Sequence, residues 1–233
     1  MWPLSACAWA LPPAPPSNPA RYLDRLHEAG FGWVDLRPDC WSGITQAEQL
    51  AGRGVRLGCA GLLPMPMPPG VSIDLLATPD FARLLPYLNG AIERAARLGA
   101  ARAYITSPSQ RLSDTTHYAR AMATLAGAAA NQGVRLCLEP HPGRALGSAD
   151  EALAFVHNVG HENLYVLLDL GHCLITREDP AEAARRAGGR LGYVHIDDND
   201  GKSDLHWPLF DGVLTRIGIE GLFGGLAGQN AVT

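Results

Sequence analysis

Residues 134–200 decide the fold, because three apolar runs there each end in ionisable side chains: VRLCLEPHP (134–142), LYVLLDLGHC (164–173) and LGYVHIDDND (191–200). We expect strands over 134–139, 164–169 and 191–197. Continuous rather than alternating hydrophobicity is typical of parallel strands that are covered on both faces. Helix-start signals stand between the runs, a Ser148–Glu151 capping box and an Asp179-Pro180 pair. This alternation predicts βαβ units and hence a parallel sheet.

The same alternation extends through the N-terminal half of the chain. Apolar runs predict four more strands, at about 3–10, 32–36, 55–61 and 102–107. Cap-and-proline pairs predict helix starts at Asn18-Pro19 and Thr78-Pro79, and Pro86 is expected to break or kink the helical stretch 80–98.

Two architectures fit this alternation, a TIM-type (β/α) barrel and an open doubly wound sheet. A doubly wound nucleotide binder has a glycine fingerprint after its first strand, whereas LPPAPPSNP (11–19) follows here. The barrel is therefore favoured, as one α/β domain over residues 1–233. Seven strands are recognised. The glycine-rich tail GIEGLFGGLAGQNAVT (218–233) has no β-type run, so the eighth strand is predicted to be missing or replaced at the C-terminus.

Composition excludes several classes of protein. The chain is 47% hydrophobic, which excludes disorder, and its net charge of −4 argues against a nucleic-acid partner. No apolar run reaches about 18 residues, so no transmembrane helix is expected. The five cysteines are odd in number and widely spaced, so reduced thiols are predicted rather than a disulfide framework. No basic residue precedes Arg21, which argues against a signal peptide, and a cytoplasmic location is predicted. Lys202, the sole lysine, lies in polar DNDGKSD (198–204), which argues against Schiff-base chemistry.

Ionisable residues gather at the ends of the last three predicted strands. Glu139 and His141, then Asp169 and His172, then His195 follow successive apolar runs, and Asp204 and His206 lie in the next loop. Carboxylate and imidazole ligands from adjacent strand ends suit a divalent cation such as Mn²⁺, Mg²⁺, Co²⁺ or Zn²⁺. The alternative interpretation is that strands simply end in polar residues where they reach water. Arg37 and Arg144 also sit near strand ends and are candidates to hold a substrate carboxylate or phosphate, against a solvated or structural role.

Four pieces of the second half resemble the xylose-isomerase-like barrel superfamily: LCLEPHP (136–142), VLLDLGHC (166–173), YVHIDDNDG (193–201) and DLHWPLFDG (204–212). The early GFGWVDLRP (30–38) is similar to the family's second-strand segment. The superfamily contains sugar and sugar-phosphate isomerases and epimerases, hydroxypyruvate isomerases, inosose dehydratases and endonuclease-IV-type nucleases. These motifs identify the superfamily and do not identify the substrate.

The resemblance implies roles at the matched positions. Glu139, Asp169 and His195 correspond to the divalent-metal ligands, and Glu139 would also be the catalytic base. His172 corresponds to a histidine that binds substrate in the isomerases, where it would act as a catalytic residue, and metal in the nucleases. Asp204 and His206 match an Asp-x-His element that supplies further metal ligands in the nucleases. His141, with His172 and Arg144, is a candidate for substrate binding.

The first functional hypothesis is a metal-dependent isomerase or epimerase of a sugar, sugar phosphate or small hydroxy-keto acid. A divalent ion that binds a carbonyl and the adjacent hydroxyl acidifies the neighbouring C–H bond and stabilises an enediolate. The family's isomerases take their last metal ligand from a glutamate on the eighth strand, and the setting of Glu220, IGIEGLFGG (217–225), resembles a turn or helix end.

Two alternatives stay open. One is a degenerate barrel that binds a metabolite or partner without catalysis, with a second copy of the chain covering the unpaired edge strands. The other is an endonuclease-IV-like phosphodiesterase. Its three-metal site needs histidines near the ends of early strands, where this chain has RPDCW (37–41), GLLPMPMP (61–68) and TSPSQ (106–110).

Overall fold

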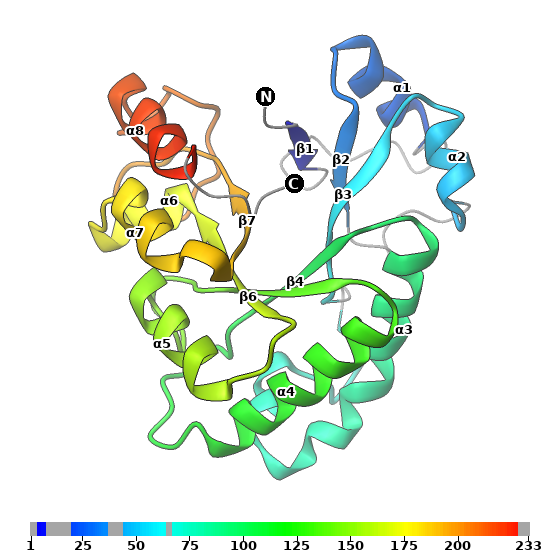
Figure 1. The fold of residues 1–233 in the computed structure, drawn as a ribbon, viewed down its shortest axis with the longest axis vertical. Coiled ribbons are helices and arrows are strands. Elements are labelled where there is room, and N and C mark those ends of the chain that lie inside the picture. Colours follow the sequence, from blue (N-terminus) through cyan, green and yellow to red (C-terminus); the bar gives the residue numbers. More distant parts are fainter. Residues whose placement is uncertain (1–3, 8–19, 37–43, 64–66, 228–233) are drawn as a thin grey trace.

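The sheet in the computed structural model contains seven strands, all parallel and paired in the order of the sequence. The structure describes residues 4–7, 20–36, 44–63 and 67–227. The strands are β1 (Ser5–Cys7), β2 (Trp33–Leu36), β3 (Arg56–Gly61), β4 (Arg102–Thr106), β5 (Arg135–Glu139), β6 (Leu164–Asp169) and β7 (Leu191–His195). The sheet curls so that β1 and β7 face each other (Figure 1), although no backbone pairing joins them in the described residues. The predicted barrel class and the seven strands are confirmed.

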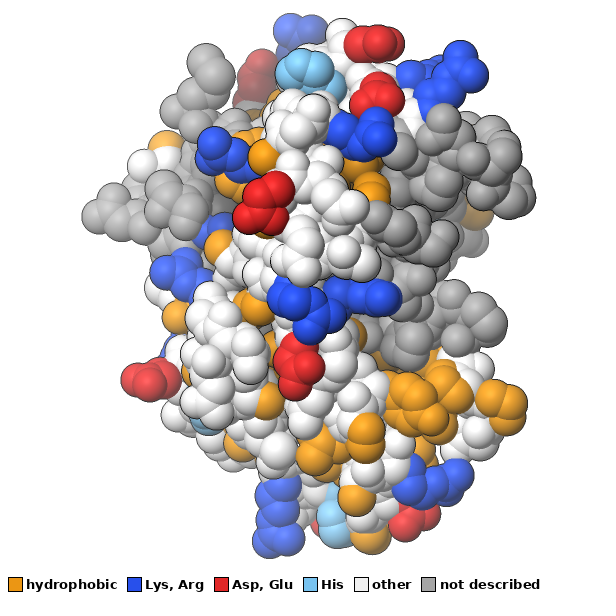
Figure 2. All heavy atoms as spheres, turned by 90° about the vertical axis from the view of Figure 1, so that its right-hand side faces the viewer, with side chains coloured by type: hydrophobic (Ala, Val, Ile, Leu, Met, Phe, Trp, Pro, Cys, Tyr) orange, Lys and Arg blue, Asp and Glu red, His pale blue; other side chains and the backbone are white. Residues whose placement is uncertain are grey.

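Helices cover the outer side of this curled sheet (Figure 1). They are α1 (Ala20–Glu28), α2 (Ala47–Ala51), α3 (Leu85–Arg97), α4 (Thr116–Asn131), α5 (Ala149–Val159), α6 (Leu170–Thr176), α7 (Pro180–Ala187) and α8 (Arg216–Leu226), with 3₁₀ segments η2 (Ile73–Ala77), η3 (Pro79–Arg83) and η4 (Gly188–Arg190). None of the described helices is both long and apolar enough to cross a membrane. On the face over α1–α3, basic and acidic side chains are interspersed (Figure 2).

Local sequence signals explain several of these boundaries. The Ser148 hydroxyl accepts a hydrogen bond from the Glu151 amide at the start of α5, and the Asp179 carboxylate caps α7 in the same way. Pro86 lies in the first turn of α3, and the residues before it form η3 rather than one long helix. The strand predicted at 3–10 is described only as Ser5–Cys7, and the Asn18-Pro19 start lies outside the described residues. The last strand ends at His195, two residues earlier than predicted.

The core has an outer layer between sheet and helices and a smaller layer inside the barrel. The outer layer contains a cluster under α1–α5 and another between β6, β7 and α6–α8. The inner cluster is formed by Cys59, Tyr104, Cys137 and Leu167, one side chain from each of four successive strands, with Tyr165 and Tyr193 packed against it. This inner cluster borders the site described next, because Tyr104 and Tyr193 also line its cavity.

The helix α8 follows β7, as a helix follows each strand of a (β/α) barrel. α8 packs closely on α7, because Gly225 has no side chain: a Cβ there would lie 2.8 Å from the Ala181 carbonyl oxygen. Glu220 is exposed on this helix and does not line the cavity described below. No strand follows β7 among the described residues, in line with the seven strands that the sequence predicts.

One buried carboxylate connects the two edge strands across the barrel. Asp35 of β2 is 3% exposed and accepts hydrogen bonds from the Ser5 hydroxyl on β1 at 2.7 Å and from the Tyr193 hydroxyl on β7 at 3.0 Å. The Cys59 amide on β3 donates to the same carboxylate at 2.8 Å. We call Asp35, Ser5, Cys59 and Tyr193 the Asp35 network. It ties the edges by side chains where they lack backbone pairing.

Replacing Gly192 by alanine is expected to lower the free energy of unfolding by about 1–3 kcal/mol, the usual cost of overpacking a filled core. A Cβ at this β7 position would lie 2.5 Å from the Cys137 sulfur and 2.7 Å from the Tyr165 Cβ. Urea unfolding measures the change. Gly189→Ala is the matched control, because a Cβ there meets nothing within 4 Å. Equal midpoints for the two variants would contradict the prediction.

Candidate active site

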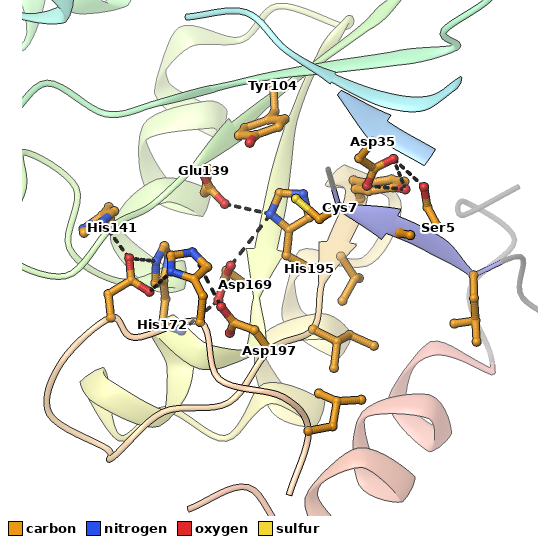
Figure 3. Close-up of a pocket in the computed structure, with 18 of the residues that line it drawn as sticks. Ser5, Cys7, Asp35, Tyr104, Glu139, His141, Asp169, His172, His195 and Asp197 are labelled. Carbon is orange, nitrogen blue, oxygen red and sulfur yellow. Dashed lines mark hydrogen bonds and ion pairs between the residues drawn. The ribbon is translucent and has the colours of Figure 1, made fainter. Parts of the chain in front are cut away.

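The carboxyl ends of β5, β6 and β7 bring the predicted ligands into one cavity of about 520 Å³ (Figure 3). Asp169 pairs with His195 on the neighbouring strand, and Glu139, Asp169 and His195 are each the last residue of their strand. The cavity volume falls within the range of about 300–1,000 Å³ that is usual for small-molecule sites.

Four of the predicted residues form a compact cluster. Glu139, Asp169 and His172 each offer a ligand atom, and these atoms lie within 4.8 Å of one another. His195 Nδ1 lies 3.0 Å from Glu139 Oε1 and 3.7 Å from Asp169 Oδ2. The two carboxylates are at most 6% exposed. Two buried carboxylates and the His172 imidazole therefore meet at one point, and the His195 ring lies against the two carboxylates.

Hydrogen bonds outside the cluster orient its members. Asp169 is the N-cap of α6, and its Oδ1 accepts the His172 amide at 2.9 Å. His172 Nδ1 lies 2.8 Å from the Pro140 carbonyl oxygen, so Nδ1 carries a proton and Nε2 faces the cavity. The ring of Tyr104 stands edge-on to that of His195, with centroids 5.0 Å apart.

The electrostatics of the cluster reflect its burial. Burial raises the pKa of Asp169, and the neighbouring Glu139 carboxylate raises it further although the histidines oppose it. Burial alone would lower the pKa of His195, but its hydrogen bond with Glu139 and the charge of Asp169 raise it to about 9. The pKa of His172 also rises to about 9, because contacts with Asp204 and Asp169 outweigh burial.

These residues fit a divalent cation. Carboxylates and imidazoles are the donor types that such ions take in mixed sites, and the ligand atoms of Glu139, Asp169 and His172 converge on one buried point. His195 Nε2 is also buried and has no hydrogen-bond partner among the described residues. Within this cluster, the negative charge of the carboxylates is balanced by protonated histidines alone. A bound divalent cation would balance the same charge.

A second group of ligand-type side chains lies beside the first. Asp204 Oδ2 is 3.3 Å from His141 Nε2 and 3.5 Å from His172 Nε2, and Asp204 Oδ1 is 3.4 Å from His206 Nδ1. Burial would raise the pKa of Asp204, but the hydrogen bonds from His141 and His172 lower it well below its usual value. Asp197 Oδ2 is 3.6 Å from His206 Nε2. His141, Asp204 and His206 thus lie where the strand-end pattern predicts.

Arg144, predicted to bind substrate, does not line the cavity. The Arg144 guanidinium donates to the Ser107 carbonyl at 3.4 Å. Its role in substrate binding stays a prediction without support from the cavity. Arg37 lies outside the described residues.

Sequence reasoning missed Asp35, Tyr104 and Tyr193, which also line the cavity. Asp35 had one signal available, because it is a charged residue inside a buried apolar run, WVDL (33–36). Burial raises the pKa of its carboxyl although the charge of His195 and its hydrogen bonds oppose this. Asp197 is half-buried in the cavity wall, and burial together with Asp169 raises its pKa to about 7.

Another acidic residue organises the loop that carries Asp204 and His206. Asp198 is fully buried and accepts hydrogen bonds from the amides of Asn199, Gly212 and Leu214 at 2.8, 2.8 and 2.9 Å. Burial would raise the pKa of Asp198, but these amides lower it. Its backbone also pairs with Trp207. The buried Asp198 carboxylate therefore fixes both ends of 198–214.

Changing Asp198 to asparagine is expected to lower the free energy of unfolding by about 1–3 kcal/mol, because one N–H donor loses its buried acceptor. The side-chain NH₂ would face either the Gly212 amide or the amides of Asn199 and Leu214. Thermal unfolding and limited proteolysis of the loop measure the effect. Asp200→Asn serves as the control, since that side chain caps a turn at the surface. Unchanged stability of Asp198→Asn would refute this assignment.

Comparisons with known proteins agree with the fold. A family model described as xylose isomerase-like TIM barrel matches residues 23–231. A D-psicose 3-epimerase from Enterocloster bolteae is 32% identical over 88 residues, which cover 36% of this chain and 29% of the relative. A 2-oxo-tetronate isomerase from Cupriavidus necator is 31% identical over 117 residues, 46% of this chain and 45% of the relative.

A solved structure of an L-ribulose 3-epimerase superposes with a TM-score of 0.77 at 24% identity, covering 98% of this chain and 78% of that one. The segments that match the two curated relatives span less than half of their length. The family model, by contrast, spans nearly the whole chain. The chain belongs to the xylose isomerase-like TIM barrel family.

Proposed function

We propose that this protein is a divalent-metal-dependent isomerase or epimerase of a sugar or a related small hydroxy-carbonyl compound, which acts through an enediolate. The observation that carries the proposal is the convergence of Glu139, Asp169, His172 and His195 in one cavity. The names of the relatives, sugar 3-epimerases and a 2-oxo-tetronate isomerase, support the same reaction class. Sugars, sugar phosphates and small hydroxy-keto acids all remain within this class.

Each member of the cluster would have a distinct task. Glu139, Asp169 and His195 would hold the cation, which could be Mn²⁺, Mg²⁺, Co²⁺ or Zn²⁺ and would polarise a carbonyl and its adjacent hydroxyl. A carboxylate oxygen of Glu139 would take the proton from the neighbouring carbon and return it. The Pro140 carbonyl would hold the His172 ring through Nδ1, and Nε2 would donate a hydrogen bond to a substrate oxygen in place of its contact with Asp204. The tilted ring of His141 lies beside it, with the ring centroids 4.6 Å apart.

The degenerate barrel stays a second candidate, because one observation favours it. In the family's isomerases a glutamate of the eighth strand completes the metal site, whereas Glu220, the candidate for that ligand among the described residues, is exposed on α8 and lies outside the cavity. Without that ligand the metal site would be weak or absent, and the cavity would bind a metabolite or partner without catalysing a reaction.

Elemental analysis of protein purified without chelator tests the proposal. We expect about one divalent ion per chain, lost in Glu139→Ala because a buried ligand disappears. Glu162→Ala is the control, since Glu162 is exposed in the turn before β6. Absence of metal even after reconstitution would contradict the proposal and favour the degenerate barrel. Two or three zinc ions per chain would favour the endonuclease-like reaction instead.

A further inference from the structure

Two tyrosine rings stand almost perpendicular to the ring of His195. Tyr104 projects from β4 toward it (Figure 3), with the ring centroids 5.0 Å apart and the ring planes at 88°. Tyr193 lies two residues before His195 on β7, with centroids 5.8 Å apart and planes at 89°. Both contacts have the edge-to-face geometry that aromatic rings prefer. We call Tyr104 and Tyr193 the tyrosine pair.

His195 lacks the hydrogen bond that usually orients a metal-binding histidine. In most metal sites the ring nitrogen that does not bind the metal donates to a carbonyl, a carboxylate or water outside the ligand set. His172 fits this rule, because its Nδ1 faces the Pro140 carbonyl oxygen at 2.8 Å. Nδ1 of His195 instead faces Glu139 and Asp169 of the cluster itself, and Nε2 is buried without a hydrogen-bond partner in the described part of the chain. Ring contacts are therefore what remains to orient His195 from outside the cluster.

Both members of the tyrosine pair are held in place. The Tyr193 hydroxyl donates to Asp35 at 3.0 Å, so this ring is anchored in the Asp35 network. Arg102, two residues before Tyr104, donates from Nε to the Gly192 carbonyl oxygen at 3.0 Å. This bond ties β4 to β7, although the two strands are not neighbours in the sheet. Two rings on strands that are tied together can fix the orientation of a third.

Resting on the proposed metal site, we propose that Tyr104 and Tyr193 are positioning residues for His195 and thereby set the affinity of the site for its divalent ion. They restrict the imidazole to the orientation in which Nδ1 faces the two carboxylates. A ligand that is already oriented loses less conformational freedom when the ion binds, so binding is tighter. The effect comes from the rings and not from the tyrosine hydroxyls.

Titration of the chelator-treated full chain with Mn²⁺, followed by the EPR signal of the free ion, tests the first ring. We expect Tyr104→Leu to raise the Kd for Mn²⁺ by about tenfold, the usual effect of losing a group that orients a metal ligand. Tyr104→Phe keeps the ring and should stay within about twofold of the wild type. A rise below about threefold in Tyr104→Leu, or an equal rise in Tyr104→Phe, overturns the proposal.

A control variant separates positioning from folding. Tyr118 of α4 is fully buried, stacks on Phe155 with centroids 4.4 Å apart and does not line the cavity. Tyr118→Leu removes a buried ring of the same size, so it should lower the urea midpoint and leave the Kd for Mn²⁺ unchanged. An equal rise of the Kd in Tyr118→Leu and Tyr104→Leu would overturn the proposal, because general loosening would then explain both. If Tyr104→Leu does not fold, Tyr104→Met, whose flexible side chain adapts to irregular gaps, is judged by the same threshold.

The second ring has its own comparison. Tyr193→Phe and Tyr193→Leu both lose the bond to Asp35, so the two variants differ in the ring alone. We expect the Kd for Mn²⁺ to be at least about threefold higher in Tyr193→Leu than in Tyr193→Phe. Equal values would overturn the role of Tyr193.

Binding of the ion needs no substrate, so this result is distinguishable from the outcome for the proposed reaction. If no sugar is converted but the tyrosine variants bind Mn²⁺ as expected, the isomerase proposal fails and the inference holds. If the wild type converts sugars and Tyr104→Leu binds Mn²⁺ as the wild type does, the inference alone fails. A wild type that binds no Mn²⁺ overturns both.

Discussion

Replacing Glu139 by glutamine is expected to lower kcat for proton exchange at the substrate carbon by about 10²–10⁴-fold, the usual contribution of a positioned general base. The amide keeps the shape of the side chain but accepts no proton. Glu139 is 6% exposed and lies 3.0 Å from His195 Nδ1, so water has little access to replace it as base. Exchange of the substrate C–H proton in D₂O, at saturating metal, measures the loss directly.

The control for this variant separates chemistry from folding. Glu162→Gln changes the same functional group at an exposed position and should leave kcat unchanged. Circular dichroism should show native secondary structure for both variants, because glutamine retains one oxygen for a hydrogen bond from His195. A Glu139→Gln enzyme with kcat close to that of the wild type would remove Glu139 from the reaction.

Asp35→Ala is expected to lower the free energy of unfolding by about 3–5 kcal/mol, since three donors around a buried carboxylate lose their acceptor at about 1–3 kcal/mol each and these costs are not additive. The donors are the Ser5 hydroxyl, the Cys59 amide and the Tyr193 hydroxyl, which come from three different strands. Loss of the Asp35 network also removes the side-chain tie between β1 and β7. Urea unfolding followed by circular dichroism measures the change.

A surface carboxylate provides the matched comparison. Asp24 accepts a hydrogen bond from Arg53 at 2.7 Å, yet its side chain is 47% exposed. Asp24→Ala should therefore cost only about 0–1 kcal/mol. If both aspartate variants shift the unfolding midpoint equally, the Asp35 network does not hold the edge strands. Tyr193→Phe, which removes a single donor, should fall between the two.

The residues at the strand ends were predictable from the sequence, because the carboxyl ends of parallel strands lie on one face of a barrel. Glu139, Asp169 and His195 each close an apolar run, so they meet on that face. Their shared cavity therefore follows from local sequence alone. His172 follows as well, since it lies one helical turn after the Asp169 cap.

Contacts between distant parts of the chain could not be predicted in this way. The partner of Asp35 on β7 lies 158 positions later in the sequence, and no local pattern links the two. Asp198 resembles a solvated loop residue until 212–214 folds back to donate its amides. Arg144 stands near a strand end, as predicted, but its guanidinium reaches the Ser107 carbonyl. The glycines of α8 resemble a turn, and close packing against α7 overrides their low helix propensity.

The sequential strand order has a consequence for how the molecule folds. Each strand pairs with its neighbour in sequence, so sheet growth needs only loop closures between adjacent βα units. The bond between Tyr193 and Asp35 closes a loop of 158 residues, which carries a larger entropic cost than any adjacent pairing. His195 stands two residues after Tyr193 on the same strand. Binding competence should therefore arise in the last kinetic phase of refolding, after the helical signal has recovered, and stopped-flow refolding with a metal-sensitive probe would resolve the two phases.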